Sequence, residues 1–437
     1  MKKSLLTLTM CFSIVMAFSQ AKTFSLQEAV SYAIEHDRRI QLAEWDIMDA
    51  AAQTKELLAS GLPQLNASIG YNFFAVLPTS LIPADFFGGA PGTFQKVQFG
   101  TRNNLTGALS ASWLAFDGSY IVAKEASALY KDLTELQVSQ VKRQIKESVT
   151  QAYINTLIYD FTKKTLDNNI KNLNQLLFET KETYKAGFAE QLDVDRLQLT
   201  LQNLENELES FKGQEKLLKD ALKYAMTYPL EDDIEIADNI DLLLANEFTS
   251  KMTESLDINN RPEMAVLDKN IELRDVDIRR NEKAYLPTVS LFANYEQTVT
   301  GNELDNLFTF PTVVMGFQVT APIFDGFAIR SRIERAQVAK EKAIIQKEDT
   351  ERGLQFQVEM ARTNFKNTYD RLERIKSNLT LAEKIHQTVK TKFKEGVGTS
   401  FEVIQAEGDL YAAQSGYAQA LYDYLKAKAD FELALGK

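Results

Sequence analysis

The chain has 437 residues, of which 25% are charged, and its net charge is −11 at neutral pH. Such an acidic protein is a poor partner for nucleic acid, because negatively charged phosphates repel it. Its single cysteine, Cys11, lies in an N-terminal segment that we expect to be removed. The mature chain would then have no disulfide bond and no thiol chemistry.

The first twenty residues have the three parts of a secretory signal peptide. Lys2 and Lys3 precede an apolar run over residues 5–18, which ends in small residues where a peptidase could cut. We therefore assign residues 1–20 to a signal peptide. A membrane anchor is disfavoured because the apolar run is too short to span a bilayer. Lipidation at Cys11 is disfavoured because the preceding residue, Met10, is bulky. No later apolar run approaches eighteen residues, so a chain that enters a bilayer would do so as strands.

In the first half of the mature chain, residues 25–60 predict a helix that Ser25 caps. Two strands of about ten to twelve residues follow, the length that a tilted strand needs to cross a bilayer. Their apolar side chains alternate with polar or small ones. These apolar residues are Leu65, Ala67, Ile69, Tyr71 and Phe73, then Leu105, Leu109, Ala111 and Trp113. The intervening segment, 77–103, is rich in proline and glycine and predicts a long irregular loop.

A continuous helix is predicted over residues 119–183, which contain neither proline nor glycine. At 1.5 Å per residue it would be about 100 Å long. Its apolar residues recur at steps of four and three, as in the seam of a coiled coil. They include Val122, Ala126, Leu129, Leu133, Leu136, Ile170, Leu173 and Leu177. A turn at Gly187 leads into a shorter helix over 192–228.

The same order of elements recurs in the second half. Residues 289–295 and 313–321 predict two strands joined by a shorter loop around 300–311. A second long helix covers 327–392, and a turn at Gly396 leads into the final helix. The apolar seam of the long helix continues into that turn and consists of Leu372, Ile375, Leu379, Ala382, His386, Val389 and Phe393.

This recurrence predicts one structural unit written twice. We divide the mature chain into a first repeat, 21–228, an acidic connector, 229–260, and a second repeat, 261–437. The strand hairpins occupy 65–116 and 288–324, and the connector is expected to form an equatorial girdle.

No nucleophile motif, metal-ligand cluster or phosphate-binding loop stands out, so we expect no enzyme, no cofactor and no metal site. Asp117 and Asp325 each precede a glycine between a strand and a long helix, where a carboxylate caps the helix. His386 falls on the apolar seam, so we expect a packed side chain rather than a ligand.

Four strands from one chain cannot close a barrel wide enough for anything to pass. Open strand edges in lipid would leave backbone groups unpaired, so several chains must share one barrel. The expected fold is an α+β membrane protein in which each chain gives four strands to a shared barrel that continues into a long helical coiled coil. Three copies would give twelve strands, but the residues alone require only an oligomer.

Several short motifs in register resemble the TolC-like outer membrane efflux protein family. They are the opening helix, the Leu-Pro and Phe-Asp-Gly that flank each hairpin, and the two glycine turns with the start of each return helix. The residues are 24–30, 62–63, 116–118, 184–187, 192–194, 286–287, 324–326, 393–396 and 401–403. The resemblance implies a homotrimer with a twelve-stranded barrel in the outer membrane of a Gram-negative bacterium. It also implies a coiled-coil tunnel in the periplasm that docks a periplasmic adaptor protein and an inner-membrane transporter.

The resemblance places the tunnel tip and the adaptor-docking surface at Gly187, Gly396 and Gly398. It also implies a pore constriction or gate, to which we assign Asp193, Glu402 and Gln405.

In the family, acidic residues at both 402 and 405 form this constriction, and an arginine and a tyrosine help to close it. Here Gln405 is uncharged, and Gly398 and Phe393 stand in the places of the arginine and the tyrosine. We therefore expect closure to depend on helix packing and on Glu402. Two interpretations of Asp193 and Glu402 stay open: rings of like charge that select cations, or acids that only start the return helices.

The expected function is an outer-membrane exit duct of a tripartite export system that passively conducts small molecules, such as drugs and toxic compounds. One alternative is the same duct serving type I protein secretion or metal export. A second is a secreted coiled-coil scaffold or adhesin, which would have no need of the four alternating strands.

Overall fold

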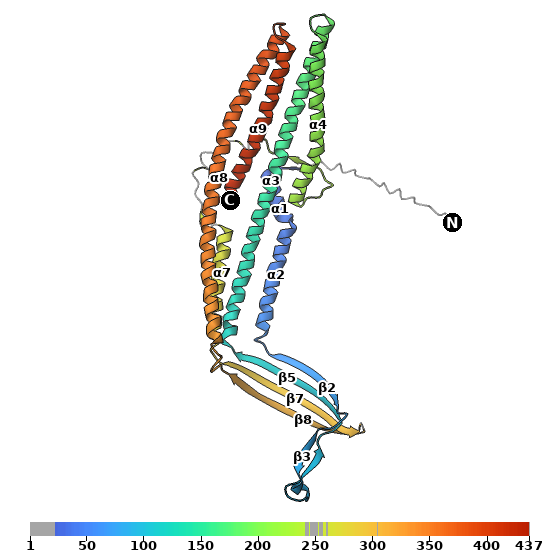
Figure 1. Ribbon diagram of the computed structural model, residues 1–437, viewed down its shortest axis with the longest axis vertical. Helices are drawn as coiled ribbons and strands as arrows, with labels where there is room; N and C mark the ends of the chain where they lie inside the picture. Colours follow the sequence, from blue (N-terminus) through green and yellow to red (C-terminus); the bar gives the residue numbers. More distant parts are fainter. Residues whose placement is uncertain are drawn as a thin grey trace, which may run out of the picture. The chain divides into compact units, whose positions relative to one another are not determined.

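The computed structural model describes residues 22–240, 244, 252, 257–258, 261–303 and 305–436. The predicted signal peptide and the greater part of the acidic connector after residue 240 lie outside the described residues. The chain divides into two compact units, whose elements Figure 1 colours in chain order. Unit 1 takes residues up to 44, 137–265 and 349 onwards, and unit 2 takes 45–136 and 266–348.

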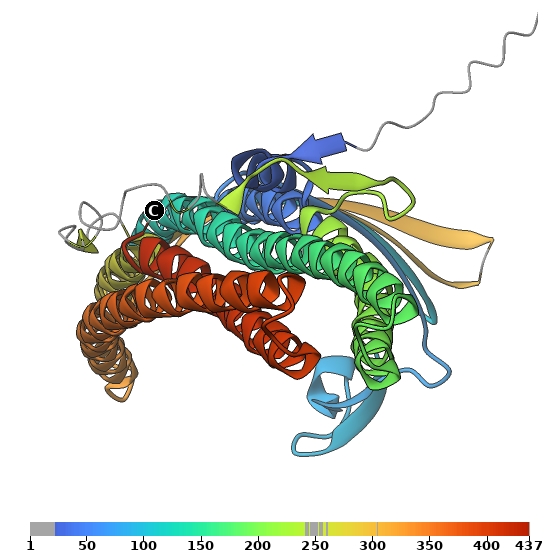
Figure 2. The ribbon, with the colours of Figure 1, turned by 90° about the horizontal axis from the view of Figure 1, so that it is seen from above.

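Unit 1 consists of helices and one short pair of parallel strands. Its elements are β1 (Lys22–Phe24), α1 (Leu26–His36), the later part of α3 (Gly118–Lys185), α4 (Gln191–Met226), β6 (Ile234–Ile236), the later part of α8 (Ala328–Lys394) and α9 (Ser400–Ala434). Seen from above, α4 runs beside α3, and α9 beside α8 (Figure 2).

Three clusters of buried side chains stabilise unit 1. The first joins α3, α8 and α9 around the fully buried Phe365 and Phe431, whose rings stack with their centroids 5.6 Å apart. The second joins β1, α1, α3 and α4 around Phe24 and Tyr153. The third lies near the helical turns and joins α3, α4 and α9. Of the predicted seam residues, these clusters bury Leu173, Leu177 and Leu372.

The first helix begins as predicted but does not continue to residue 60. Ser25 and Glu28 form a reciprocal capping box at the start of α1. The helix then ends at Asp37, whose backbone is extended, and α2 (Arg38–Ala59) starts after it. The Asp37 carboxylate accepts from the Arg39 backbone N–H at 2.7 Å and pairs with its guanidinium at 2.7 Å. This local bonding competes with the helical hydrogen bonds, so the prediction of one unbroken helix was wrong.

Unit 2 combines helices with an antiparallel sheet. Its helices are most of α2, the start of α3, most of α7 (Pro262–Lys283) and the start of α8. Its sheet has the order β2 (Gln64–Phe73), β5 (Asn103–Phe116), β7 (Thr288–Glu303) and β8 (Asn306–Thr320), and the four strands lie side by side in Figure 1. The two predicted hairpins thus pair with each other through β5 and β7, and β2 and β8 are the edge strands.

The sheet has one apolar face and one mainly polar face. One row across all four strands is Leu65, Ala111, Ala293 and Met315. The next row, on the opposite face, is Asn66, Ser110, Asn294 and Val314. Successive side chains of a strand point to opposite faces, so the predicted alternation is confirmed.

The long helices begin at the predicted aspartates. The Asp117 carboxylate accepts from the Ser119 and Tyr120 backbone N–H groups at 2.7 and 3.3 Å. Asp325 accepts from the Ile329 N–H at 2.6 Å. α3 has 68 residues and α8 has 67. None of the helices in the described part of the chain has the length of apolar sequence that a membrane crossing needs.

The predicted irregular loop over 77–103 was wrong in part. It contains a hairpin of β3 (Thr79–Pro83) and β4 (Phe94–Gln98) with a 3₁₀ turn, η1 (Ala84–Phe87), between them. Gly88 and Gly92 have φ values of 80° and 83°, which glycine adopts without strain, so these residues turn the chain inside a hairpin. Strands of five residues are too short for alternation to reveal them.

The second predicted loop, around 300–311, was also wrong. β7 continues to Glu303, and β8 begins at Asn306. Pro311 lies inside β8, opposite Gln297. A proline has no N–H to donate and is tolerated on an edge strand, so it does not end β8.

Candidate functional site

The candidate site consists of the turns that join α3 to α4 and α8 to α9. In each turn a glycine closes the long helix: Gly187 has a φ of 82° and Gly396 a φ of 77°. Their N–H groups donate to Tyr184 O at 2.9 Å and to Phe393 O at 3.0 Å. This left-handed conformation is unstrained only for glycine, which explains the residue type at both positions.

Gly398 is required for a different reason, the close approach of the backbone. A Cβ atom added to it would lie 2.9 Å from the Phe393 nitrogen and 3.2 Å from atoms of Lys392. The Gly398 N–H donates to Lys392 O at 3.1 Å. An arginine at position 398, as in the family pattern, would therefore need a different turn.

The two acidic residues predicted for the gate occupy matching places in the return helices. Asp193 forms a capping box with Glu190, and its carboxylate accepts from the Glu190 N–H at 3.1 Å. Glu402 forms one with Thr399, in which Thr399 N–H donates to the carboxylate at 3.2 Å and Glu402 N–H to the hydroxyl at 3.3 Å. Both acids therefore start their helices, which is one of the two interpretations that the sequence left open.

Gln405, the third predicted gate residue, lies one helical turn after Glu402. Its side chain is exposed, and its amide donates to Asp409 Oδ1 at 3.1 Å. The Asp193 carboxylate, in addition to its bond from the Glu190 N–H, accepts a hydrogen bond from the Ser400 hydroxyl. Within one chain, the three predicted gate residues thus have separate partners.

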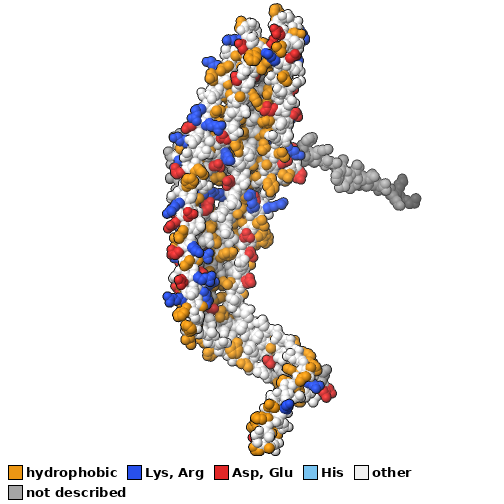
Figure 3. Space-filling model, in the orientation of Figure 1, with side chains coloured by type: hydrophobic (Ala, Val, Ile, Leu, Met, Phe, Trp, Pro, Cys, Tyr) orange, Lys and Arg blue, Asp and Glu red, His pale blue; other side chains and the backbone are white. Residues whose placement is uncertain are grey.

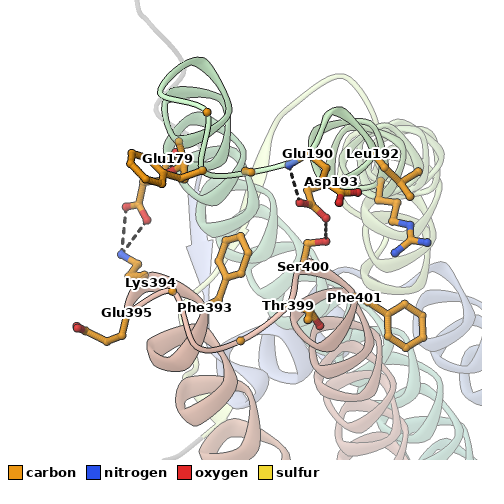
Figure 4. A pocket seen from close by; sticks show the side chains of 17 residues that line it. Glu179, Glu190, Leu192, Asp193, Phe393, Lys394, Glu395, Thr399, Ser400 and Phe401 are labelled. Atoms are coloured by element: carbon orange, nitrogen blue, oxygen red, sulfur yellow. Dashed lines mark hydrogen bonds and ion pairs between the residues drawn. The ribbon is translucent and has the colours of Figure 1, made fainter.

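Contacts between the two turns connect the pair α3 and α4 to the pair α8 and α9 (Figure 4). The Ser400 hydroxyl of α9 donates to Asp193 of α4. Lys394 of α8 pairs with Glu179 of α3 at 2.9 Å. Hydrogen bonds from Gln175 and then from Lys394 lower the pKa of the Glu179 carboxyl.

A third contact places the Arg196 guanidinium 5.6 Å from the ring centroid of Phe401. The two turns together line a cavity of about 1110 Å³. Sequence reasoning missed Arg196 and Glu179 as members of this site, and it missed the contacts that Ser400 and Phe401 make there, because no local pattern links residues about 200 positions apart.

Each turn presents an apolar side chain to solvent immediately after its glycine. Phe188 is 85% exposed and Val397 is 77% exposed. Leu192 and Phe401, at the starts of the return helices, are also exposed. Apolar side chains that gather at one exposed place are typical of a surface that binds another protein.

His386 lies between α8 and α9, away from the turns. It is buried, and its Nε2 lies 2.7 Å from Glu407 Oε1. The expectation of a packed side chain on the helical seam is confirmed.

Comparisons with known proteins agree with this arrangement. Residues 255–437 match the family described as outer membrane efflux protein. Nodulation protein T of Rhizobium leguminosarum bv. trifolii is 21% identical over 414 residues, which cover 94% of this chain and 85% of that protein. The pyoverdine export outer membrane protein OpmQ of Pseudomonas aeruginosa is 22% identical over 420 residues, which cover 91% of this chain and 84% of that protein.

The same fold is found among solved structures. The open state of the MtrE outer membrane channel of Neisseria gonorrhoeae superposes with a TM-score of 0.72 at 15% identity, covering 94% of this chain and 88% of that channel. The motifs, the helical turns and these likenesses agree: residues 255–437 match the outer membrane efflux protein family, and nearly the whole chain is similar to an outer membrane export protein and to an outer membrane channel.

Proposed function

We propose that this chain is the outer-membrane exit duct of a tripartite export system, which passively conducts small molecules delivered by an inner-membrane pump. The observation that carries the proposal is the sheet whose apolar face extends over all four strands and whose two outer strands, within the described residues, have free edges. The match of residues 255–437 to the outer membrane efflux protein family and the similarity to a relative named for export support the same function.

The free edges favour a shared barrel. β2 and β8 have no strand partner on their outer sides in the described chain. In lipid each unpaired backbone group costs several kcal/mol, so the edges of one copy need those of another. Three copies would close a barrel of twelve strands, and the matching lengths of α3 and α8 and of α4 and α9 support a twofold repeat within each copy.

The turns are the proposed docking surface for a periplasmic adaptor. Gly187, Gly396 and Gly398 hold two tight turns that leave Phe188 and Val397 exposed. The two turns differ in sequence, so an adaptor would meet two unlike sites in each copy. Burial of these apolar side chains would favour the complex by about 25 cal/mol per Å².

Membrane fractionation tests the proposed assembly directly. We expect the full-length protein in the outer-membrane fraction, as a species of three chains that dissociates only when heated in detergent. The measurement is gel mobility with and without heating, together with the mass of the purified particle. A monomer recovered without detergent would contradict the duct and favour the scaffold.

The proposed gate consists of Asp193, Glu402 and Gln405 from each copy. Glu402→Gln tests the charge alone, because glutamine at this position of a capping box still accepts the Thr399 N–H. With three copies, we expect the preference of the channel for K⁺ over Cl⁻ to fall about fourfold in 0.1 M salt, since the three charges attract each passing cation and repel each anion. Reversal potentials in planar bilayers measure this preference.

Thr399→Ala is the matched control for the gate. It breaks the same capping box but keeps the Glu402 charge, so it should loosen the helix start and leave the ion preference unchanged. If both variants behave alike, Glu402 serves only the helix and the charged ring does not exist.

A further inference from the structure

The sheet of unit 2 is almost free of charge. Within its four described strands, Glu296 and Glu303 are the only residues with charged side chains, and there is no lysine or arginine. Glu303 lies at the end of β7, opposite Asn306 at the turn into β8. Figure 3 shows the contrast with the helices, along which acidic and basic side chains are interspersed. Glu296 is therefore the one charge in the body of the sheet.

The register places Glu296 on the mainly polar face. It stands in one row with Ser68, Ala108 and Thr312, and this row neighbours that of Asn66, Ser110 and Asn294 on the same face. The side chain is exposed, and its Oε1 accepts a hydrogen bond from the Thr298 hydroxyl at 3.1 Å. Its row neighbours are small and uncharged, so the carboxylate charge is not compensated within these strands.

A carboxylate in this position fits an aqueous lumen. A charged side chain that faces hydrocarbon near the middle of the bilayer destabilises a barrel protein, which is why such residues avoid the lipid side. The apolar rows account for the lipid-facing side, so the opposite face, with Glu296, lines the inside of the proposed barrel. A fixed negative charge in a narrow aqueous passage concentrates cations and excludes anions.

We propose that Glu296 is a specificity-determining residue of the duct: its copies form a negative ring inside the strand region that favours cationic over anionic cargo. The proposal rests on the proposed function. It is independent of the tip, because Glu402 belongs to a helical turn of unit 1, whereas Glu296 belongs to the sheet of unit 2. The duct would then select by charge in two separate parts of the chain.

The test is the permeability ratio of K⁺ to Cl⁻ for the purified full-length assembly in a planar bilayer with a KCl gradient. Three unit charges about 10 Å from an ion in water change its local concentration about twofold in 0.1 M salt, and more when screening is weaker. K⁺ gains this factor and Cl⁻ loses it, so Glu296→Gln should lower the ratio about fourfold at 0.1 M KCl, with a larger change at 0.01 M. The same substitution in a Glu402→Gln background should lower it again, because the tip contribution is already removed.

Two controls separate charge from structure. Asn294→Asp restores a carboxylate on the same face one row away, so the double variant with Glu296→Gln should recover the ratio. Glu303→Gln removes an acid at the turn and should have a smaller effect. Recovery of heat-dissociable assemblies verifies that each variant folds.

The outcomes distinguish this inference from the proposed function. If the unaltered protein conducts but Glu296→Gln leaves the ratio unchanged, the negative ring is absent and the duct stands. If the ratio falls but Asn294→Asp does not restore it, the effect is not the charge of this face, and the inference fails. If the unaltered protein conducts no ions, the duct itself fails and Glu296 has nothing to select.

Discussion

Arginine at position 313 is expected to prevent membrane insertion, whereas arginine at position 314 is expected to be tolerated. Val313 and Val314 are neighbours near the middle of β8 and point to opposite faces of the sheet. Val313 lies opposite Tyr295 in an apolar row, and Val314 lies opposite Asn294 in a polar row. An arginine facing lipid near the bilayer midplane costs about 2–4 kcal/mol. In the proposed barrel every copy pays this cost, so few assembled channels should form.

The pair is matched because both positions hold valine, both are exposed in one chain, and both variants add the same charge. The measurement is the yield of heat-dissociable assembly in the outer-membrane fraction. We expect a large loss for Val313→Arg and a yield close to normal for Val314→Arg. Equal yields would mean that the apolar face does not contact lipid, and the reverse order would mean that the faces are assigned the wrong way round.

Removal of the guanidinium of Arg261 is expected to destabilise unit 1 by about 2–4 kcal/mol. Arg261 is 1% exposed and donates to the last carbonyls of α9, those of Leu433 and Ala434, at 3.1 and 2.5 Å. It also pairs with Glu263 at 3.2 Å. Arg261→Met keeps much of the side-chain volume but leaves the Ala434 carbonyl without this donor.

One nearby group limits the loss. Arg143 also binds Glu263, and it donates to the Leu433 carbonyl at 2.9 Å. Glu263 and the Leu433 carbonyl therefore each keep a partner when the Arg261 guanidinium is removed. Burial, and then the neighbouring charge of Arg261, lower the pKa of Arg143. The substitution therefore relieves some repulsion between the two cations, and the expected loss is smaller than for an isolated buried ion pair.

Thermal unfolding in detergent, followed by circular dichroism at a helical wavelength, measures this loss. Arg279→Met is the matched control: Arg279 binds Glu125 through both nitrogens at 2.9 and 2.6 Å, but both side chains are about half exposed. Its removal should shift the unfolding midpoint much less than the removal of Arg261, because an exposed ion pair contributes little to stability. Equal shifts of the midpoint for the two variants would show that the buried guanidinium gives no special stability to the end of α9.

The long helices and the paired strands were predictable because their signals are long and repetitive. A stretch free of proline and glycine predicts a long helix, and ten or more alternating residues predict a strand. The same reasoning failed at Asp37, where it predicted an unbroken helix. A single side chain that bonds to a neighbouring backbone group can end a helix inside an amphipathic pattern. The short β3 and β4 were missed because composition outweighs alternation over five residues.

The site was predictable only where it depends on local geometry. Gly187 and Gly396 were recognisable because a left-handed turn requires glycine. The bond between Ser400 and Asp193 and the ion pair between Lys394 and Glu179 join segments about 200 residues apart, and no spacing rule connects them. The proposed role of Glu296 in charge selection likewise depends on the strand register, which places it in a row with uncharged neighbours.

The parallel pair of β1 and β6 has a consequence for biogenesis. β1 lies at the start of the described chain, yet its partner comes about 210 residues later, where Phe24 pairs with Ile236. Beyond this register, the Ala237 N–H donates to Phe24 O at 2.9 Å. During export with the N-terminus leading, β1 must wait without a partner until residue 237 has followed it. The pairing of β1 is therefore completed only after α3 and α4 have been exported. Until then chaperones and proteases have access to the unpaired strand.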